Sequence, residues 1–279
     1  MSDPMFIVDA ERLRGAERIV LDGDEGRHAA AVRRVGRGET VELTDGRGNL
    51  ARCVVVAADR SGLVCEVRER TGEPPAAPRI VVAQAVPKGD RGEVAVETMT
   101  EVGVDEIIPW FARRTVTRWR SDRGDRSLRR WRATAREAAK QSRRAWVPEV
   151  ADPVTTAALA RRLSGADLAV VLHQEAGRPI GDLPLPEIGD VVLVVGPEGG
   201  ITSDELAEFD AAGAVQVNLG PAVLRTSTAG TVAAGVVLSR TGRWRGGPGR
   251  HRSWVATRPG SSASRTSAGD PPHRTGRPR

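Results

Sequence analysis

The pattern of apolar and polar residues changes character once along the chain, near residue 75. Up to about residue 72, short apolar and β-branched runs alternate with turn signals such as Asp22-Gly23, Asp45-Gly46 and Ser61-Gly62. Short runs bounded by turn residues predict β-strands. The expected strands are residues 6–8, 19–21, 40–43, 52–56 and 63–67, with one helical stretch at 26–35. We therefore predict that residues 1–72 form a small β-barrel domain.

The segment Glu73-Pro74-Pro75-Ala76-Ala77-Pro78 predicts a stiff, extended linker at residues 73–78. Beyond it, apolar strand-like runs alternate with helix-like segments, which is the pattern of an α/β fold with a mainly parallel sheet. The expected strands are 80–86, 106–110, 168–172, 191–195 and 214–219, and the expected helices are 93–102, 127–145, 153–163, 203–211 and 226–239. We predict that residues 79–240 form this second domain. Residues 241–279, rich in Gly, Pro, Ser and Arg, are expected to be a disordered basic tail.

The net charge of +6 is distributed unevenly along the chain. Residues 241–279 contain nine Arg and a single acid, Asp270, so the remainder is close to neutral. Within that remainder, residues 112–147 contain thirteen Arg or Lys against three acids. Such a local field attracts polyanions, although a solvated helical face is an alternative interpretation. With six Trp, three Phe and no Tyr, stacking on exposed bases is not expected to dominate recognition.

Cysteine and histidine are too sparse to predict a metal site. Cys53 and Cys65 lie in strand-like segments and are expected to be buried free thiols, and the four His are scattered at 28, 173, 251 and 273. The sequence begins without a secretory signal pattern, and no apolar run approaches the roughly 20 residues that cross a membrane. We therefore expect a cytoplasmic protein with no metal and no membrane partner.

A glycine-rich turn follows the expected strand 191–195. It reads Val195-Gly196-Pro197-Glu198-Gly199-Gly200-Ile201, with Thr202 or Ser203 as the expected cap of the next helix. Glycines let the backbone approach a ligand closely, and α/β sheets bind ligands at the ends of parallel strands. The turn lacks the Gly-Lys-Ser/Thr of a P-loop and the spacing of the dinucleotide-binding fingerprint. It is therefore a candidate ligand loop of another class, with a purely structural turn as the alternative.

A second turn, Asn218-Leu219-Gly220-Pro221, ends the expected strand 214–219, and a helix follows with its expected cap near Thr226. Arg225 places a positive charge at this helix start, where the helix itself already favours anions. It indicates a negative partner outside the helix, with an ordinary surface arginine as the alternative. His173 follows strand 168–172 and would bring a third strand end to the same rim; a structural histidine is the alternative.

Together these motifs resemble the SPOUT superfamily of knotted methyltransferases. The chain is similar in particular to the RsmE-type family, which methylates N3 of a uridine in small-subunit (16S) ribosomal RNA. The likeness rests on Gly196-Pro197-Glu198-Gly199-Gly200 and on Leu219-Gly220-Pro221-x-Val223-Leu224-Arg225-Thr226-x-Thr228-Ala229. It is extended by Lys88-Gly89-Asp90-Arg91, residues 100–104, residues 136–142, His28, residues 32–35 and residues 45–48, so that it spans roughly residues 6–240.

The resemblance implies a PUA-like barrel followed by a SPOUT domain with a C-terminal trefoil knot, acting on ribosomal RNA as a homodimer with S-adenosylmethionine as cofactor. Arg225 is the candidate catalytic residue, because a cation beside the uracil would stabilise the N3 anion. The implied cofactor-binding residues are Leu172, His173, Gly196, Glu198, Gly199, Gly200, Ile201, Leu219, Gly220, Val223, Leu224 and Thr226. The expected RNA-binding residues are His28, Arg33, Arg34, Arg136 and Arg143.

Three residues depart from the family pattern: Ala222 where many relatives carry Arg, Ser227 where many carry Glu, and Gln174 where Pro is frequent. They bear on the affinity for RNA and cofactor. Two other functions stay open at this stage: a SPOUT methyltransferase acting on transfer RNA or on a ribose 2′-oxygen, and a non-catalytic RNA-binding or ribosome-assembly protein. A nucleotide-dependent oxidoreductase is not favoured, because the glycine spacing and its acidic partner are missing.

Overall fold

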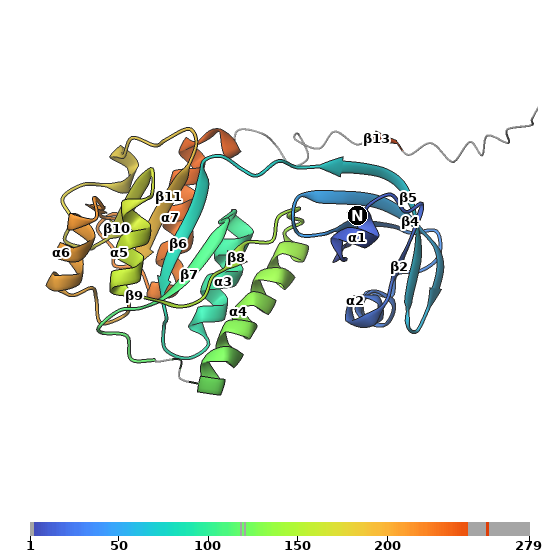
Figure 1. Cartoon of the computed structure of the whole chain (residues 1–279), viewed down its shortest axis with the longest axis horizontal. Coiled ribbons are helices and arrows are strands. Elements are labelled where there is room, and N and C mark those ends of the chain that lie inside the picture. Colours follow the sequence, from blue (N-terminus) through green and yellow to red (C-terminus); the bar gives the residue numbers. More distant parts are fainter. Residues whose placement is uncertain (1–2, 118, 120, 245–254, 257–279) are drawn as a thin grey trace, which may run out of the picture.

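The computed structural model describes residues 3–117, 119, 121–244 and 255–256, without the side chains of residues 121–123 and 255–256. Figure 1 shows two domains side by side, joined by the segment 73–78. No helix among the described residues is long and apolar enough to span a bilayer.

The first domain is built on a six-stranded sheet with a mostly antiparallel arrangement. Its strands, in sheet order, are β1 (Met5–Ile7), β3 (Thr40–Thr44), β4 (Asn49–Asp59), β5 (Gly62–Gly72) and β13 (Val255–Ala256), with β2 (Arg18–Leu21) also paired to β5. Only the β1–β3 pair is parallel among these strands. Helices α1 (Ala10–Leu13) and α2 (Gly23–Arg27) complete the domain, and α2 continues into a π-helical turn, His28–Val32.

Cys53 and Cys65 lie on β4 and β5 in the core of this domain, and both are buried free thiols, as expected. Burial raises the pKa of the Cys65 thiol to about 11. Burial, together with the neighbouring Cys65, raises the pKa of Cys53 to about 12. Because the thiolate is the reactive form and these raised pKa values disfavour it, the two cysteines are unreactive core residues.

The second domain contains a seven-stranded sheet whose pairings are all parallel. In sheet order its strands are β12 (Val215–Val217), β10 (Leu168–Leu172), β11 (Asp190–Val195), β6 (Arg79–Ala85), β7 (Glu106–Phe111) and β8 (Glu149–Val150), with β9 (Val154–Thr155) also paired to β7. The predicted architecture, an α/β domain preceded by a small β-domain, is confirmed. The threading of a trefoil knot stays a prediction.

Helices cover both faces of the parallel sheet (Figure 1). On one face lie α3 (Arg91–Val102), α4 (Ser121–Gln141) and α7 (Thr226–Arg240), and on the other lie α5 (Thr156–Ser164) and α6 (Ser203–Ala211). Side chains alternate along β6, so Ile80 and Val82 join the first core and Val81 and Ala83 the second. This two-sided burial explains why the strands read as continuous apolar runs.

Helices α4 and α5 differ most from the boundaries expected from the sequence. Helix α4 begins at Ser121, in a charged stretch without apolar periodicity, and ends at Gln141 rather than 145. It ends early because Arg143 adopts a left-handed conformation, φ 57°, that does not continue a helix. Helix α5 begins at Thr156 rather than 153, because Val154–Thr155 pair with β7 and Thr155 caps the helix.

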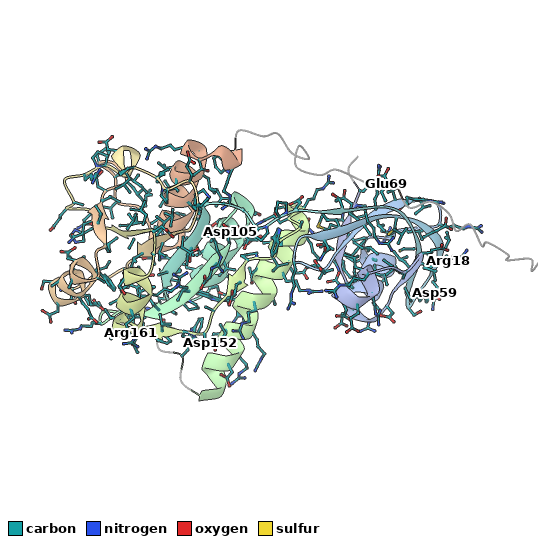
Figure 2. The ribbon with its side chains drawn as sticks, turned by 45° about the horizontal axis from the view of Figure 1, so that its top comes forward. Arg18, Asp59, Glu69, Asp105, Asp152 and Arg161 are labelled. Carbon is teal, nitrogen blue, oxygen red and sulfur yellow. The ribbon has the colours of Figure 1, made fainter. Side chains whose placement is uncertain are left out.

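The predicted tail contains ordered residues at its start, which corrects the expectation for 241–244. Gly242–Trp244 forms a 3-10 turn held by Arg243, whose guanidinium donates to Asp105 at 2.5 Å and to the Gly103 carbonyl at 2.9 Å. Asp105 (Figure 2) also accepts from Arg144 at 3.4 Å and from the Ile80 amide at 2.9 Å. The composition predicts disorder for residues 241–244, but the largely buried ion pair between Arg243 and Asp105 orders them. Further along the same segment, β13 pairs with β5.

The two domains meet along the end of α4 and the segment that follows it. Glu25 of α2 pairs with Lys140 at 3.0 Å and with Arg136 at 3.5 Å. Trp146 donates from its indole to the Glu73 carbonyl at 2.9 Å. Gly48, at φ 93°, leaves no room for a side chain, since a Cβ atom would lie 2.7 Å from the Trp146 ring. These contacts fix the first domain against the arginine-rich helix.

Candidate functional site

The carboxyl ends of β10, β11 and β12 open into one pocket with a volume of about 820 Å³. The loops that follow these strands come from three distant parts of the chain. All thirteen residues expected to bind the cofactor or to act in catalysis line this pocket: Leu172, His173, Gly196, Glu198, Gly199, Gly200, Ile201, Leu219, Gly220, Val223, Leu224, Arg225 and Thr226. The structure thus brings together the two glycine turns and the His173 loop, as parallel strands require of their carboxyl ends.

The first glycine turn is shaped by close backbone packing. A Cβ atom on Gly196 would lie 2.7 Å from Cγ1 of Ile201, so only glycine fits. Gly200 has φ 75°, and its amide donates to the Pro197 carbonyl at 2.9 Å. Helix α6 then begins with Thr202 as its cap, one of the two caps expected. This close packing fixes the main chain of the turn at the pocket, which Glu198 and Ile201 also line.

The second turn has a glycine that borders open space. Gly220 has φ 102°, and a Cβ atom there would meet no protein atom within 4 Å. Its amide donates to Asn218 Oδ1 at 3.0 Å, and Asn218 donates to the Ala176 carbonyl at 2.7 Å, which ties this turn to the loop after β10. His173 is anchored by its backbone amide to the Val217 carbonyl at 2.9 Å. Gly220 lines the pocket, so a larger residue here would change the lining of the pocket and strain the backbone at this positive φ.

Arg225 stands at the N-terminus of α7 and lines the pocket. It is the N-cap residue, next to Thr226 as expected, and its carbonyl accepts the amides of Thr228 and Ala229 at 3.0 Å each. Within the described part of the chain, no hydrogen bond or ion pair is seen for its exposed guanidinium. The cation is therefore available to a ligand. Gln84 of β6 fixes the helix start from below, donating to the Thr226 carbonyl at 3.2 Å.

A buried carboxylate beneath the rim ties three loops together. Glu205 of α6 is 0% exposed. It accepts the Arg113 amide at 2.7 Å, the Thr156 hydroxyl at 2.9 Å, and the Thr202 amide at 3.0 Å and hydroxyl at 2.9 Å. Burial alone would raise the pKa of Glu205, but these donors outweigh it and lower the pKa below its ordinary value.

Two arginines that line the pocket, Arg91 and Arg114, were not among the predicted site residues. Arg91 is the first residue of α3, and Arg114 follows β7 and donates to the Gly199 carbonyl at 3.0 Å. Both follow strands of the same parallel sheet, β6 and β7, whose carboxyl ends share the rim. The strand-end rule that selected the glycine turns could have found them, but their loops carry no glycine motif.

The predicted RNA-binding residues lie around the junction of the two domains. His28 and Arg33 border the π-helical turn next to Glu25, and Arg34 follows with φ 54°. Arg136 lines a second cavity, of about 690 Å³, between the domains. Its charge is partly engaged, since it also donates to the Ile7 carbonyl at 3.4 Å and pairs with Glu25. Arg143 follows α4 in the same region.

The departures from the family pattern fall at the same site. Gln174 and Ala222 are exposed and line the pocket, whereas Ser227 is buried at the start of α7.

Comparison with known proteins agrees with this geometry. The RNA methyltransferase domain family matches residues 74–238, and the RNA methyltransferase PUA domain family matches residues 21–68. The ribosomal RNA small subunit methyltransferase E of Mycobacterium bovis is 49% identical over 244 residues, covering 86% of this chain and 93% of that protein.

Two solved structures extend the comparison to the cofactor. A methyltransferase of Legionella pneumophila with bound S-adenosylmethionine is 25% identical and has a TM-score of 0.78, covering 86% of this chain and 99% of the other. The small subunit methyltransferase E of Neisseria gonorrhoeae, also bound to S-adenosylmethionine, is 25% identical with a TM-score of 0.75, covering 85% and 98%. This chain therefore belongs to the ribosomal RNA small subunit methyltransferase E family of S-adenosylmethionine-dependent RNA methyltransferases.

Proposed function

We propose that this chain methylates N3 of one uridine in the 16S RNA of the small ribosomal subunit, with Arg225 as its catalytic residue. The observation that carries the proposal is the meeting of two glycine turns and Arg225 around one pocket at the sheet rim. The family relationship supplies the substrate class, since the Mycobacterium bovis relative is named for the small-subunit ribosomal RNA.

The pocket suits S-adenosylmethionine in size and in chemistry. Its volume of about 820 Å³ lies within the range of cofactor sites. Backbone groups of the two turns, with Leu172, Ile201 and Leu219, would hold the cofactor, and the open space at Gly220 leaves it room. When bound, the cofactor supplies an electrophilic methyl group on a positively charged sulfur. The residues of this chain then have to place a nucleophile in line with that group.

Arg225 supplies what a uridine nucleophile lacks. N3 of uracil carries a proton and is a poor nucleophile until that proton is released to solvent. The N3 anion can then accept the methyl group as the bond to sulfur breaks, with S-adenosylhomocysteine as the other product. A guanidinium beside the base stabilises the resulting anion, in the manner of a preorganised electrostatic site. The Arg225 side chain is suited to this because it is exposed at the pocket and its backbone is fixed at the start of α7.

The RNA would be held by both domains. We assign phosphate contacts to His28, Arg33, Arg34, Arg136 and Arg143, around the junction where α4 meets α2. The PUA domain family match to residues 21–68 supports a role for the first domain in RNA binding. Phosphate contacts position RNA without reading its sequence, so binding should weaken as salt increases.

A homodimer is supported by the exposed face of α7. This helix has no charged residue from Thr226 to Ser239, although only one side packs on the sheet and on α3. Val232 of α7 is 40% exposed and Val94 of α3 is 47% exposed. An uncharged helix face that carries an exposed valine is favourable to cover, and a second copy of the chain would cover it. Val223, 75% exposed in the pocket loop, would place that interface beside the site. We place the dimer in the cytoplasm, with its ribosomal substrate.

Mass mapping of the methylated product tests this function. Undermethylated small subunits would be incubated with the chain and with labelled S-adenosylmethionine, with transfer RNA and large subunits as control substrates. We expect one methyl group on N3 of a single uridine in 16S RNA. Label on a ribose 2′-oxygen or on transfer RNA would assign the chain to another target, and RNA binding without any transfer would make it a non-catalytic assembly protein.

A further inference from the structure

Arg114 lines the pocket, but the proposed roles of the glycine turns and of Arg225 do not include it. It lies on the loop 112–115 between β7 and α4, and its Nη1 donates to the Gly199 carbonyl at 3.0 Å. A Cβ atom on Gly199 would lie 3.1 Å from Cβ of Arg114, so the loop and the glycine turn are in direct contact. Arg114 thus forms part of the wall of the pocket while its side chain stays exposed to solvent.

The backbone on both sides of Arg114 is held firmly. The buried Glu205 accepts the Arg113 amide at 2.7 Å, and the Thr115 amide donates to the Ala112 carbonyl at 3.0 Å. Thr115 is itself buried, at 6% exposure. A side chain on a fixed backbone loses less entropy when it binds a ligand, which is how positioning residues are built.

Arg113 and Arg114 differ in whether a carboxylate pairs with their guanidinium groups. Arg113 is paired with Asp204 at 2.6 Å and lies outside the pocket. In the part of the chain that the structure describes, no carboxylate pairs with Arg114, and its one hydrogen bond occupies one of five guanidinium donors. Arg91, also exposed, lines the same pocket. The same lining also contains two carboxylates, Glu175 and Glu198, so the pocket carries both signs of charge. Arg114 itself has no carboxylate partner among the described residues and is available to an anion.

An anion can reach Arg114 from solvent, because its side chain is exposed. Helix α4, which begins at Ser121, extends toward the first domain (Figure 1). A guanidinium matches the oxygens of a phosphate diester in a bidentate manner. An RNA strand has one phosphate per nucleotide, so a base in the pocket places a phosphate near its rim.

We propose that Arg114 is a positioning residue that binds a backbone phosphate of the RNA strand next to the target nucleotide, so that the base is held in the pocket beside Arg225. This inference rests on the proposed function. It gives Arg114 a role in RNA binding rather than in cofactor binding.

Three variants test it: Arg114→Gln, Arg114→Lys, and Arg113→Gln as the matched neighbour. The dissociation constant for S-adenosylmethionine is measured by calorimetry, and the dissociation constant and KM for small subunits are measured over a range of salt concentrations. We expect Arg114→Gln to raise both RNA constants about tenfold, the size of one charged phosphate contact, and to lower the salt slope by about 1. The affinity for the cofactor should stay within about twofold. Arg114→Lys should regain only part of the RNA affinity, because lysine keeps the positive charge but not the bidentate geometry.

Each other outcome has a distinct meaning. Weaker cofactor binding with unchanged RNA constants would show that Arg114 holds the glycine turn or the cofactor, and would overturn the inference. Equal RNA constants for Arg114→Gln and Arg113→Gln would overturn it as well. Failure of the wild-type chain to transfer a methyl group would contradict the proposed function, whereas the binding constants for RNA would still decide the role of Arg114.

Discussion

Arg225 is the residue on which the proposed chemistry depends most. If its guanidinium stabilises the uracil anion, Arg225→Ala should lower kcat about 100-fold or more, as removal of one such donor does. The affinity for S-adenosylmethionine should change little, because the glycine turns rather than Arg225 surround the cofactor. Single-turnover methyl transfer and calorimetry measure the two effects separately. The first turn of α7 should stay folded in this variant, because the Arg225 side chain makes no capping hydrogen bond.

Arg178→Ala is the control, because Arg178 is an exposed arginine outside the pocket whose side chain contacts only the Asp182 carbonyl among the described residues. It should leave both quantities unchanged. Equal losses of kcat and cofactor affinity in Arg225→Ala would remove Arg225 from the catalytic role.

Single residues also explain what a sequence reading misses. Gly196 and Gly220 were found because strand–glycine–helix turns are visible in the sequence, and parallel strands bring their ends together. Arg114 and Arg91 were not found, because an arginine in a basic segment gives no sign of which wall of a pocket it lines. Glu205 reads as a helix-surface residue in an acidic first turn, yet it is 0% exposed.

At the scale of elements, Glu205 connects α6, α5 and the loop after β7. Glu205→Gln should destabilise the fold by about 2–4 kcal/mol, because it leaves buried donors without a charged acceptor. Urea unfolding with matched m-values measures this. Glu208→Gln, on the same helix, is the control and should change stability by less than about 0.5 kcal/mol.

The same pair of variants has a defined pH dependence. The pKa of Glu205 is lower in the folded state than in the unfolded chain, so its stabilising contribution is fully present above the unfolded value of about 4.3. It is lost as the pH falls through the lower folded pKa. The stability difference between wild type and Glu205→Gln should therefore be constant from pH 7 to 5 and shrink below about pH 4. A difference that grows in acid would contradict the lowered pKa.

Elements with strong apolar periodicity were placed correctly from the sequence, and those without it were not. Five strands of the parallel sheet (β6, β7, β10, β11 and β12) were predicted within one or two residues, because burial on both faces leaves a continuous apolar signal. Strands β8, β9 and β13 were missed, since two paired residues give no periodicity. The start of α4 was missed because its first turn carries charge instead of an apolar stripe.

At the scale of the whole molecule, the ion cluster of Asp105, Arg144 and Arg243 ties the chain's C-terminal turn to the parallel sheet. The side chains of Arg243 and Asp105 are only 14% and 15% exposed. Removing one partner of a largely buried ion pair leaves the other charge buried without that partner. Arg243→Ala should therefore lower the free energy of unfolding by about 3 kcal/mol. Arg161→Ala, at an exposed arginine of α5 (Figure 2), should have almost no effect in the same chemical unfolding experiment. Equal free energies of unfolding for the two variants would contradict a stabilising role of this ion cluster.

The account as a whole depends on the two glycine turns enclosing the methyl donor. Calorimetric titration with S-adenosylmethionine of the wild-type chain, Gly220→Val and Gly213→Val tests this directly. Gly213 has φ 85° and open space around it, like Gly220, but lies outside the pocket, so both variants carry the same backbone strain. We predict one cofactor bound per chain for the wild type and for Gly213→Val, and no detectable binding for Gly220→Val. Wild-type affinity in Gly220→Val, or no binding by the wild type, would contradict the account.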